Sequence, residues 1–339
     1  MSQTNIVIVG AGVLGLSCAV QLSKCGYRVT TIAKDLPGDL SIDYASPWAG
    51  AHFRPSPAKT AADKLEQQMM RETYTEFEDI AAKYPESGIA FVPGNGYVGW
   101  PDFRVLPQEE YPKGHENIRL GVSYRCWVLN SPVYLLWLKS RAEGLGVHFV
   151  KGQVSRLEDA AAILLPSRGL DGGSSTIVIN ATGRGLDDPA SFPSRGQFVH
   201  VANECRETIS HHWADGSSTV IIPRPLGGGT IIGGTKEPND WSAEVSATVT
   251  DVVLKRAVEL EPGLIQHDVA ATSTSGFKIL QEYVARRPMR NGGLRLESET
   301  GPGKPPIIHC YGAGASGFKI SWGVATRVHK FVADLEAKQ

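Results

Sequence analysis

The chain has 339 residues, of which 42 % are hydrophobic and 20 % charged, as expected of a globular chain with two ordinary domains or one large composite domain. Its formal net charge of −1 gives no reason to expect nucleic acid or an acidic membrane as a partner. The five cysteines are few and odd in number, which argues against a disulfide framework and favours a reducing compartment.

The two ends of the chain bear on its location. The apolar run 6–16 has no Lys or Arg before it and is interrupted by glycines, unlike a signal peptide. No apolar run approaches the roughly 20 residues that span a bilayer. The C-terminus does not read Ser-Lys-Leu, the peroxisomal signal. We therefore expect a cytoplasmic protein with no membrane partner.

The chain opens with a predicted β-α-β unit. Residues 6–9 are typical of a buried strand, a helix follows to about Cys25, and residues 29–33 form a second strand. Between the first strand and the helix lies a G-x-G-x-x-G sequence, whose glycines favour a tight turn and close approach of a pyrophosphate. The free N–H groups and positive dipole end of the helix would attract the phosphates. The unit therefore predicts a bound dinucleotide.

The acidic residue that usually ends the second strand of such a unit is displaced. The sequence there reads Ala33-Lys34-Asp35. We expect Asp35 or Lys34 to serve the ribose or the phosphates of the cofactor. The departure argues against NAD in particular.

Helical spacing returns downstream. Apolar residues at positions 65, 69, 74, 77 and 80 predict a helix over 62–84. Ser131-Pro132 is typical of an N-cap followed by proline in the first turn, and predicts a helix through Leu145. The apolar runs 147–150 and 176–179 are typical of buried parallel strands. The turn after the second run, which contains Thr182 and Gly183, commonly lines the pyrophosphate of a flavin.

The pattern changes between residues 197 and 235. Short apolar runs at 198–199, 220–222 and 230–232 are separated by Gly, Pro and polar clusters, which is typical of an antiparallel meander. A helix over 246–260, a buried strand over 307–311 and a final helix ending near Ala337 follow. Because parallel strands are predicted at the beginning, middle and end, the expected fold class is α/β with interleaved domains.

Five further blocks occur in a fixed order along nearly the whole chain, and as a set they resemble the D-amino acid oxidase family in its fungal D-amino acid oxidase and D-aspartate oxidase forms. The blocks are Y-A-S-P-W-A-G-A (44–51), S-R-G-Q (194–197), I-I-P-R-P with I-G-G-T (221–235), R-P-x-R-x-G-G (287–293) and Y-G-A-G-A-S-G with S-W-G (311–323).

The resemblance implies a Rossmann-like FAD-binding domain, residues 1–55, 131–195 and 294–339, interleaved with an antiparallel-sheet substrate-binding domain, residues 56–130 and 196–293. It implies FAD as the cofactor. We expect this FAD to be bound without a covalent link, because the chain has glycine-rich phosphate and flavin loops and no cysteine or histidine in a recognised flavinylation motif. The expected FAD contacts are Gly10, Ala11, Gly12, Val13, Leu14, Gly15, Lys34, Asp35, Ser46, Trp48, Ala49, Gly50, Thr182, Gly183, Gly312, Gly314, Ala315, Ser316, Gly317, Phe318 and Lys319.

The resemblance also implies a reaction. The Cα hydrogen of an amino acid moves to the flavin, dioxygen is the acceptor, and a 2-oxo acid, ammonia and hydrogen peroxide result. Arg287 lies where the family binds the substrate carboxylate, which a guanidinium can hold through two parallel hydrogen bonds. Arg286 and Arg290 are its neighbours in sequence. Ser316 is a further expected catalytic residue.

Lys319 has two open interpretations: additional positive charge near the flavin, or a solvated lysine in the first turn of a helix.

The substrate pocket departs from its relatives at two positions. Members of the family usually carry tyrosine at the positions of Val220 and Lys236. D-aspartate oxidases carry arginine at the position of Lys236, and this arginine binds the side-chain carboxylate of the substrate. Lys236 is therefore expected to act in catalysis and to favour acidic or polar substrates. D-aspartate oxidases carry a second arginine at the position of Ala214. The sequence features of an enzyme for acidic substrates are therefore only partly present. His212 is expected to roof the pocket beside Val220, and no metal site is predicted because no residues have ligand spacing.

Three functions stay open from the sequence. The first is oxidation of D-amino acids, the second is oxidation of glycine or a secondary amine, and the third is flavin binding without turnover. Loss of the pocket tyrosines keeps the second open, whereas Arg287 and the intact flavin loops argue against the third. The expected partners are a small amino acid and dioxygen; a homodimer and a peroxisomal location are the family-based alternatives.

Overall fold

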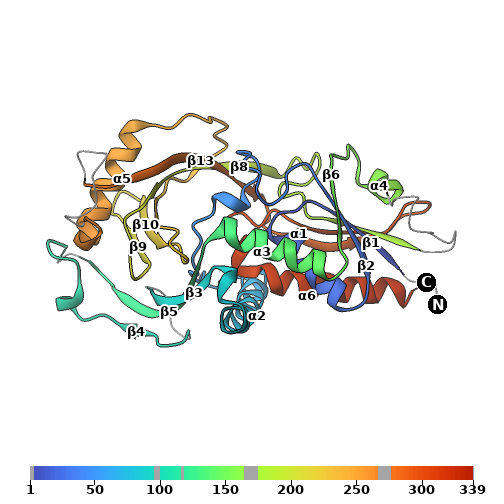
Figure 1. Cartoon of the computed structure of the whole chain (residues 1–339), viewed down its shortest axis with the longest axis horizontal. Helices are drawn as coiled ribbons and strands as arrows, with labels where there is room; N and C mark the ends of the chain where they lie inside the picture. Colours follow the sequence, from blue (N-terminus) through green and yellow to red (C-terminus); the bar gives the residue numbers. More distant parts are fainter. Residues whose placement is uncertain (1–3, 95–99, 116–117, 164–174, 266–275, 339) are drawn as a thin grey trace.

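The computed structural model describes residues 4–94, 100–115, 118–163, 175–265 and 276–338. Figure 1 shows two layered parts side by side, one around a parallel sheet and the other around an antiparallel sheet. The helices are α1 (Val13–Lys24), α2 (Ala61–Lys83), α3 (Ser131–Gly144), α4 (Leu157–Ala160), α5 (Ala247–Leu260) and α6 (Gly317–Glu336).

The first sheet has six strands in the order β14-β15-β7-β1-β2-β6, all parallel except β14. All six come from the three segments that the sequence assigns to FAD binding. The strands are β1 (Asn5–Val9), β2 (Arg28–Ala33), β6 (His148–Lys151), β7 (Thr176–Asn180), β14 (Arg295–Glu299) and β15 (Ile307–Tyr311).

Both faces of this sheet are covered, as its continuous apolar strands require. Ile6 and Ile8 of β1 pack in a core with helices α1, α2, α3 and α6. Val7 and Val9 point to the other face, where the core includes Ala160 of α4. The predicted β-α-β unit and the parallel sheet are therefore confirmed.

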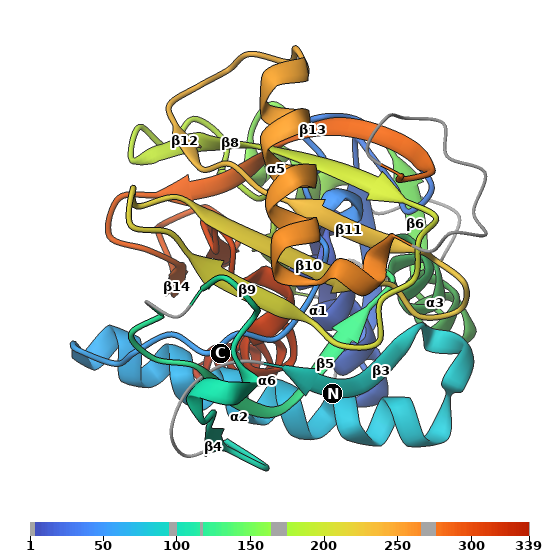
Figure 2. The same ribbon diagram turned by 90° about the vertical axis from the view of Figure 1, so that its left-hand side faces the viewer.

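The second sheet follows the order β12-β8-β11-β10-β9, with β13 paired to β8. Ile221 faces outward into a core with α5, which Figure 2 shows lying across the strands, whereas Ile222 faces inward towards Trp48 and Phe198. The strands are β8 (Ser191–Val201), β9 (Ile209–His212), β10 (Ser218–Pro223), β11 (Thr230–Gly233), β12 (Glu237–Pro238) and β13 (Ile279–Arg290).

A small third sheet contains β3 (Ile89–Gly94), β5 (Val122–Leu129) and β4 (Arg104–Val105). Helix α2, from the same stretch of chain, packs Met69 against Gly323 of α6, where an added Cβ would lie 2.5 Å from the Met69 Cα. The packing is thus continuous across the domain boundary that the sequence places at residue 55.

One local prediction is wrong. The N-cap of α3 is Asn130, and Ser131 is already helical, with its hydroxyl donating to the Ala49 carbonyl. The predicted helix over 62–84 is present as α2; its packed face begins at Met69, and Leu65 is 44 % exposed.

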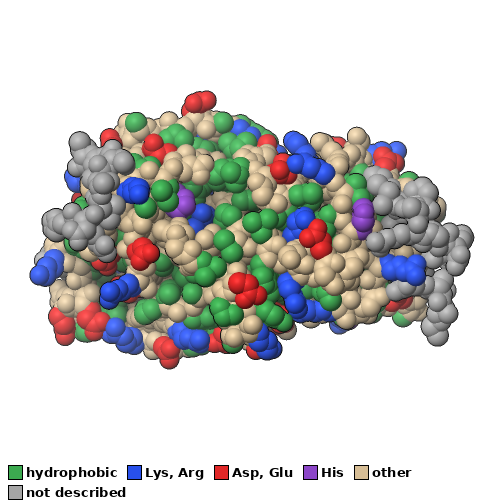
Figure 3. Space-filling view, in the orientation of Figure 1, with side chains coloured by type: hydrophobic (Ala, Val, Ile, Leu, Met, Phe, Trp, Pro, Cys, Tyr) green, Lys and Arg blue, Asp and Glu red, His purple; other side chains and the backbone are tan. Residues whose placement is uncertain are grey.

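The face of the molecule drawn in Figure 3 has no large area of only positive or only negative charge. Basic and acidic side chains are both spread over it, with hydrophobic patches between them in the centre. Within the described ranges, no helix has the length and apolar character needed to cross a lipid bilayer.

Candidate active site

A cavity of about 340 Å³ lies where the two sheets meet. Its wall includes the amino ends of α1 and α6, the short helix η1 (Ser46–Trp48) with the segment that follows it, and the inner face of the antiparallel sheet. Most predicted site residues line it: Gly12, Val13, Leu14, Ser46, Trp48, Ala49, Gly50, Gly183, Val220, Lys236, Arg287, Gly312, Gly314, Ala315, Gly317, Phe318 and Lys319.

At one end of the cavity the glycine-rich turn opens the helix α1. Gly10 has a φ of +111°, and a Cβ there would lie 2.4 Å from the Ala181 carbonyl oxygen. A Cβ on Gly15 would lie 2.0 Å from the Gly10 oxygen, so helix and strand pack as closely as the motif predicts. The first turn of α1 contains no acidic residue. Its positive dipole end therefore faces the cavity without a counter-charge from that turn.

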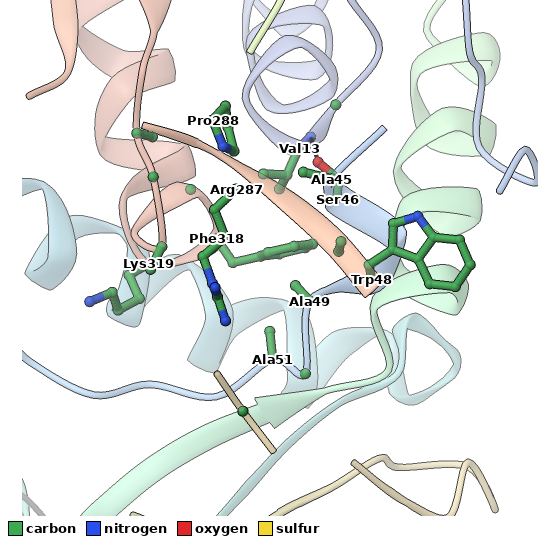
Figure 4. A pocket seen from close by; sticks show the side chains of 18 of the residues that line it. Val13, Ala45, Ser46, Trp48, Ala49, Ala51, Arg287, Pro288, Phe318 and Lys319 are labelled. Carbon is green, nitrogen blue, oxygen red and sulfur yellow. Dashed lines mark hydrogen bonds between the residues drawn. The ribbon is translucent and has the colours of Figure 1, made fainter. Parts of the chain in front are cut away.

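The loop that follows β2 is tied to the antiparallel sheet. The buried guanidinium of Arg224 donates to the carbonyl oxygens of Gly50 and Ala49, each at 2.9 Å. The Tyr283 hydroxyl donates to the Trp48 carbonyl at 3.0 Å. These bonds hold residues 48–50 against the cavity. In Figure 4 the Trp48 ring points away from Arg287 and Phe318.

Arg287 on β13 lies in the cavity wall next to Phe318 (Figure 4). Its guanidinium stacks over the Phe198 ring at 5.3 Å, and Nη1 donates to the Arg195 carbonyl at 3.3 Å. Desolvation lowers the pKa of Arg287 from its usual value. No carboxylate in the described part of the chain pairs with it, so it can accept an anionic ligand.

Lys319, at the start of α6, is only partly exposed and donates to the Arg54 carbonyl at 3.0 Å. Desolvation lowers its pKa to about 8. The interpretation of Lys319 as a solvated surface residue is therefore wrong, because its ammonium group is enclosed at the cavity wall.

Val220 and Lys236 both reach the cavity, although they differ in burial. Val220 pairs with Gly233 in the β10–β11 ladder and is half-buried. Lys236 is exposed. A flexible ammonium at an exposed position can interact with a ligand or turn to solvent.

Several predicted residues lie outside the cavity wall. Ser316 donates its hydroxyl to Glu66 at 2.6 Å, and Thr182 donates to Asn180 at 2.7 Å. His212 does not line the cavity, although it contacts Arg54, which does. The others are Gly10, Ala11, Gly15, Lys34 and Asp35, which lie in the first turn and helix or follow β2.

Among the cavity residues that the sequence does not predict, His52 and Arg54 carry titratable side chains. They alternate with the buried residues Ala51 and Phe53, which is the period of an extended segment with one packed face. That alternation, at the end of the Y-A-S-P-W-A-G-A block (44–51), is the signal that could have found them.

His52 is a neutral hydrogen-bonding group in the wall. Its Nδ1 lies 2.7 Å from the Thr208 hydroxyl, which itself donates to the Ile221 carbonyl. Because that hydroxyl proton is used, His52 must donate from Nδ1. Burial and the nearby charges of Arg54 and Lys319 lower its pKa to about 3, so it stays neutral at physiological pH.

Residues 5–329 match the family model described as FAD dependent oxidoreductase. The chain belongs to this family. FAD is thus the cofactor of this FAD-dependent oxidoreductase, and the cavity fits it: the two glycine-rich helix starts open on one space, and neither has an acidic residue in its first turn.

Named relatives cover nearly the whole oxidoreductase. It is 36 % identical over 369 residues to a D-aspartate oxidase of Talaromyces thermophilus, spanning 98 % of this chain and 94 % of that protein. It is 34 % identical to a D-amino-acid oxidase of Schizosaccharomyces pombe, over 95 % and 94 %. The glycine oxidase structure of Geobacillus kaustophilus has the same fold, with a TM-score of 0.71 at 18 % identity over 98 % and 95 %.

Proposed function

We propose that the protein oxidises D-amino acids with FAD and dioxygen, giving 2-oxo acids, ammonia and hydrogen peroxide. The observation that carries this proposal is Arg287, a desolvated guanidinium without a carboxylate partner among the described residues, in the wall of the FAD cavity. The names of the relatives support the handedness of the substrate.

The chain's residues then have defined tasks. Arg287 binds the substrate carboxylate and fixes the Cα, and Phe198, stacked against the guanidinium, holds its plane. FAD supplies the redox chemistry when bound. The amino ends of α1 and α6 stabilise the negative charge of the cofactor, and Lys319 adds a cation beside α6. The apolar wall, including Val220 and Ile222, excludes water from the reacting centre.

We further propose that acidic or polar D-amino acids are preferred over large apolar ones. Lys236 supports this preference, because an acidic side chain would provide a partner for its ammonium whereas an apolar one would desolvate it. The cavity wall contains four cationic side chains, Arg54, Lys236, Arg287 and Lys319, and no Asp or Glu among the residues that the structure describes.

The preference is tested by kcat/KM for D-Asp, D-Glu, D-Ala and D-Phe on the wild type and on Lys236→Met. We expect the wild type to favour the acidic pair, and the substitution to reduce the ratio of acidic to neutral substrates. An unchanged ratio would show that Lys236 does not read the side chain.

We also propose a cytoplasmic location. Cys18, Cys126 and Cys310 are buried and free, and Cys25 and Cys205 are free as well, as in a reducing compartment. A fluorescent fusion imaged beside a peroxisomal marker tests this: diffuse signal is expected, and punctate overlap with the marker would contradict it.

A further inference from the structure

One corner of the cavity carries a second basic group besides Arg287. It consists of Arg54, Lys319 and the adjacent His212, which we call the basic corner. Arg54 comes from the segment before α2, Lys319 from α6 and His212 from β9. Arg54 and Lys319 line the cavity, together with Ser218 of β10. The corner is therefore built from three separate stretches of chain.

Arg54 is held in place at both ends. Its carbonyl oxygen accepts a hydrogen bond from Lys319 Nζ at 3.0 Å, and its Nη1 lies 3.0 Å from His212 Nε2. A guanidinium stays protonated in proteins and can only donate, so His212 must accept on Nε2 and be neutral. The backbone and the side chain of Arg54 are thus both oriented by neighbours.

The partners of Arg54 differ from those of structural arginines in the chain. Arg195 pairs with Glu237, Arg290 with Asp188 and Arg327 with Glu72. Within the described residues no carboxylate forms an ion pair with Arg54, as is also true of Arg287. Arg54 is half-buried and lines the cavity, so its guanidinium is free to pair with a carboxylate that a ligand supplies.

Lys236 is less suited than Arg54 to fix the direction of a carboxylate. It is exposed, and its ammonium is a strongly hydrated point charge on a flexible chain. A planar guanidinium can hold a carboxylate through two parallel hydrogen bonds, which fixes its direction as well as its charge. The basic corner is therefore better suited than Lys236 to orient a second carboxylate.

We propose that Arg54, oriented by His212, binds the side-chain carboxylate of an acidic D-amino acid while Arg287 binds its α-carboxylate. This inference rests on the proposed function and names a residue that, together with Lys236, sets its substrate class. Arg54 is a specificity residue, and His212 acts through it as a positioning residue.

The test uses succinate and butyrate, which have four carbons each and differ by one carboxylate. Their Kd values for the FAD-bound protein are measured from the change in flavin absorbance, without turnover. We expect wild type to bind succinate more tightly than butyrate. Arg54→Gln should reduce this selectivity at least about 10-fold, the loss of one charged contact of about 1.4 kcal/mol. Lys64→Gln, the same charge change on the exposed face of α2, should leave it unchanged.

The role of His212 is tested by rescue. His212→Ala removes the acceptor for Arg54 and should lose much of the succinate selectivity. His212→Gln keeps an acceptor oxygen at this position and should restore most of it. Equal selectivity in the two variants would overturn the positioning role, because a merely structural effect would not depend on the acceptor.

The result distinguishes this inference from the function on which it rests. If D-amino acids are not oxidised, the proposed function fails, whatever succinate does. If they are oxidised and Arg54→Gln leaves succinate selectivity intact, only the assignment of Arg54 fails. A loss of FAD affinity with unchanged selectivity would make Arg54 a cofactor contact and would also overturn the inference.

Discussion

Arg286, Arg287 and Arg290 all lie on β13, but their partners differ. Arg286 forms an ion pair with Asp43 at 3.3 Å, and Arg290 pairs with Asp188 at 2.8 Å. Both charges are already compensated within the chain. Arg287 faces the cavity without such a partner among the described residues, which leaves it as the arginine that can anchor a substrate.

We expect Arg287→Ala to raise KM for D-amino acids by about one to three orders of magnitude, since a buried carboxylate loses roughly 2–5 kcal/mol without its charged partner. FAD should remain bound, as judged by the flavin absorbance of the purified variant. Arg286→Ala, the control one residue away, should change KM much less. A near-normal KM in Arg287→Ala would place the anchor elsewhere.

Lys319 predicts a pH dependence of cofactor affinity. Its pKa of about 8 means that the ammonium form is present below that pH and lost above it. We therefore expect the Kd of the apoprotein for FAD to rise severalfold between about pH 7 and pH 9, because an attractive charge disappears. Fluorescence titration of FAD measures this. Lys319→Met should bind less tightly at pH 7 and lose the step; a wild-type Kd that stays constant would contradict the assignment.

Single residues show where sequence patterns stop being informative. Arg287 is found from its motif, but Lys319 donates hydrogen bonds to Arg54 and Ser56, which lie more than 260 residues earlier in the chain. Arg54 itself carries no motif. Its importance comes from the convergence of α6 and β9 on one segment, which no local pattern records.

Among the elements, the pairing of β8 with β13 determines where the Arg287 guanidinium lies. Gly196 of β8 lies opposite Ala285, and a Cβ at Gly196 would come within 2.4 Å of Arg287 Nη1. The glycine of the S-R-G-Q block thus makes room for the guanidinium. The clashing atoms are the far end of a flexible side chain, so the fold can adapt but the anchor must move.

Gly196→Ala should therefore raise KM for D-amino acids about 10-fold or more and change Tm little. Steady-state kinetics and thermal unfolding measure the two effects. Gly144→Ala is the matched control, because nothing lies within 4 Å of a Cβ at that position. If Gly196→Ala lowers Tm strongly with normal KM, the glycine serves packing alone.

The elements also differ in how accurately they can be predicted from the sequence. The parallel strands are continuous apolar runs and were predicted within about one residue. Strand β13 was not predicted over its length, because Arg286, Arg287 and Pro288 interrupt any apolar pattern. Those residues are tolerated because, among the strands that the structure describes, β13 pairs with β8 alone and lies at an edge, where proline loses no ladder bond.

At the scale of the molecule, the cofactor cavity is formed by segments from residue 12 to residue 319. Because FAD would contact both sheets and would bind the folded but not the unfolded chain, its binding should stabilise the whole protein against unfolding. FAD at 100 times its Kd contributes about 2.7 kcal/mol, so removing it should lower Tm by several degrees.

We expect FAD to be bound without a covalent link, since no cysteine or histidine of the chain lies in a recognised flavinylation motif and, among the described residues, no cysteine lines the cavity. Acid precipitation should release the yellow chromophore into the supernatant. Colour that stays with the pellet would mean a covalent bond.

Oxidation of D-amino acids by this chain with FAD is tested by mixing the purified yellow protein anaerobically with single amino acids and following the flavin absorbance near its visible maximum. We expect bleaching by D-amino acids, fastest with D-Asp or D-Glu, and none by the L-enantiomers. Bleaching by glycine or sarcosine instead of D-amino acids, or by no amino acid at all, would contradict this expectation.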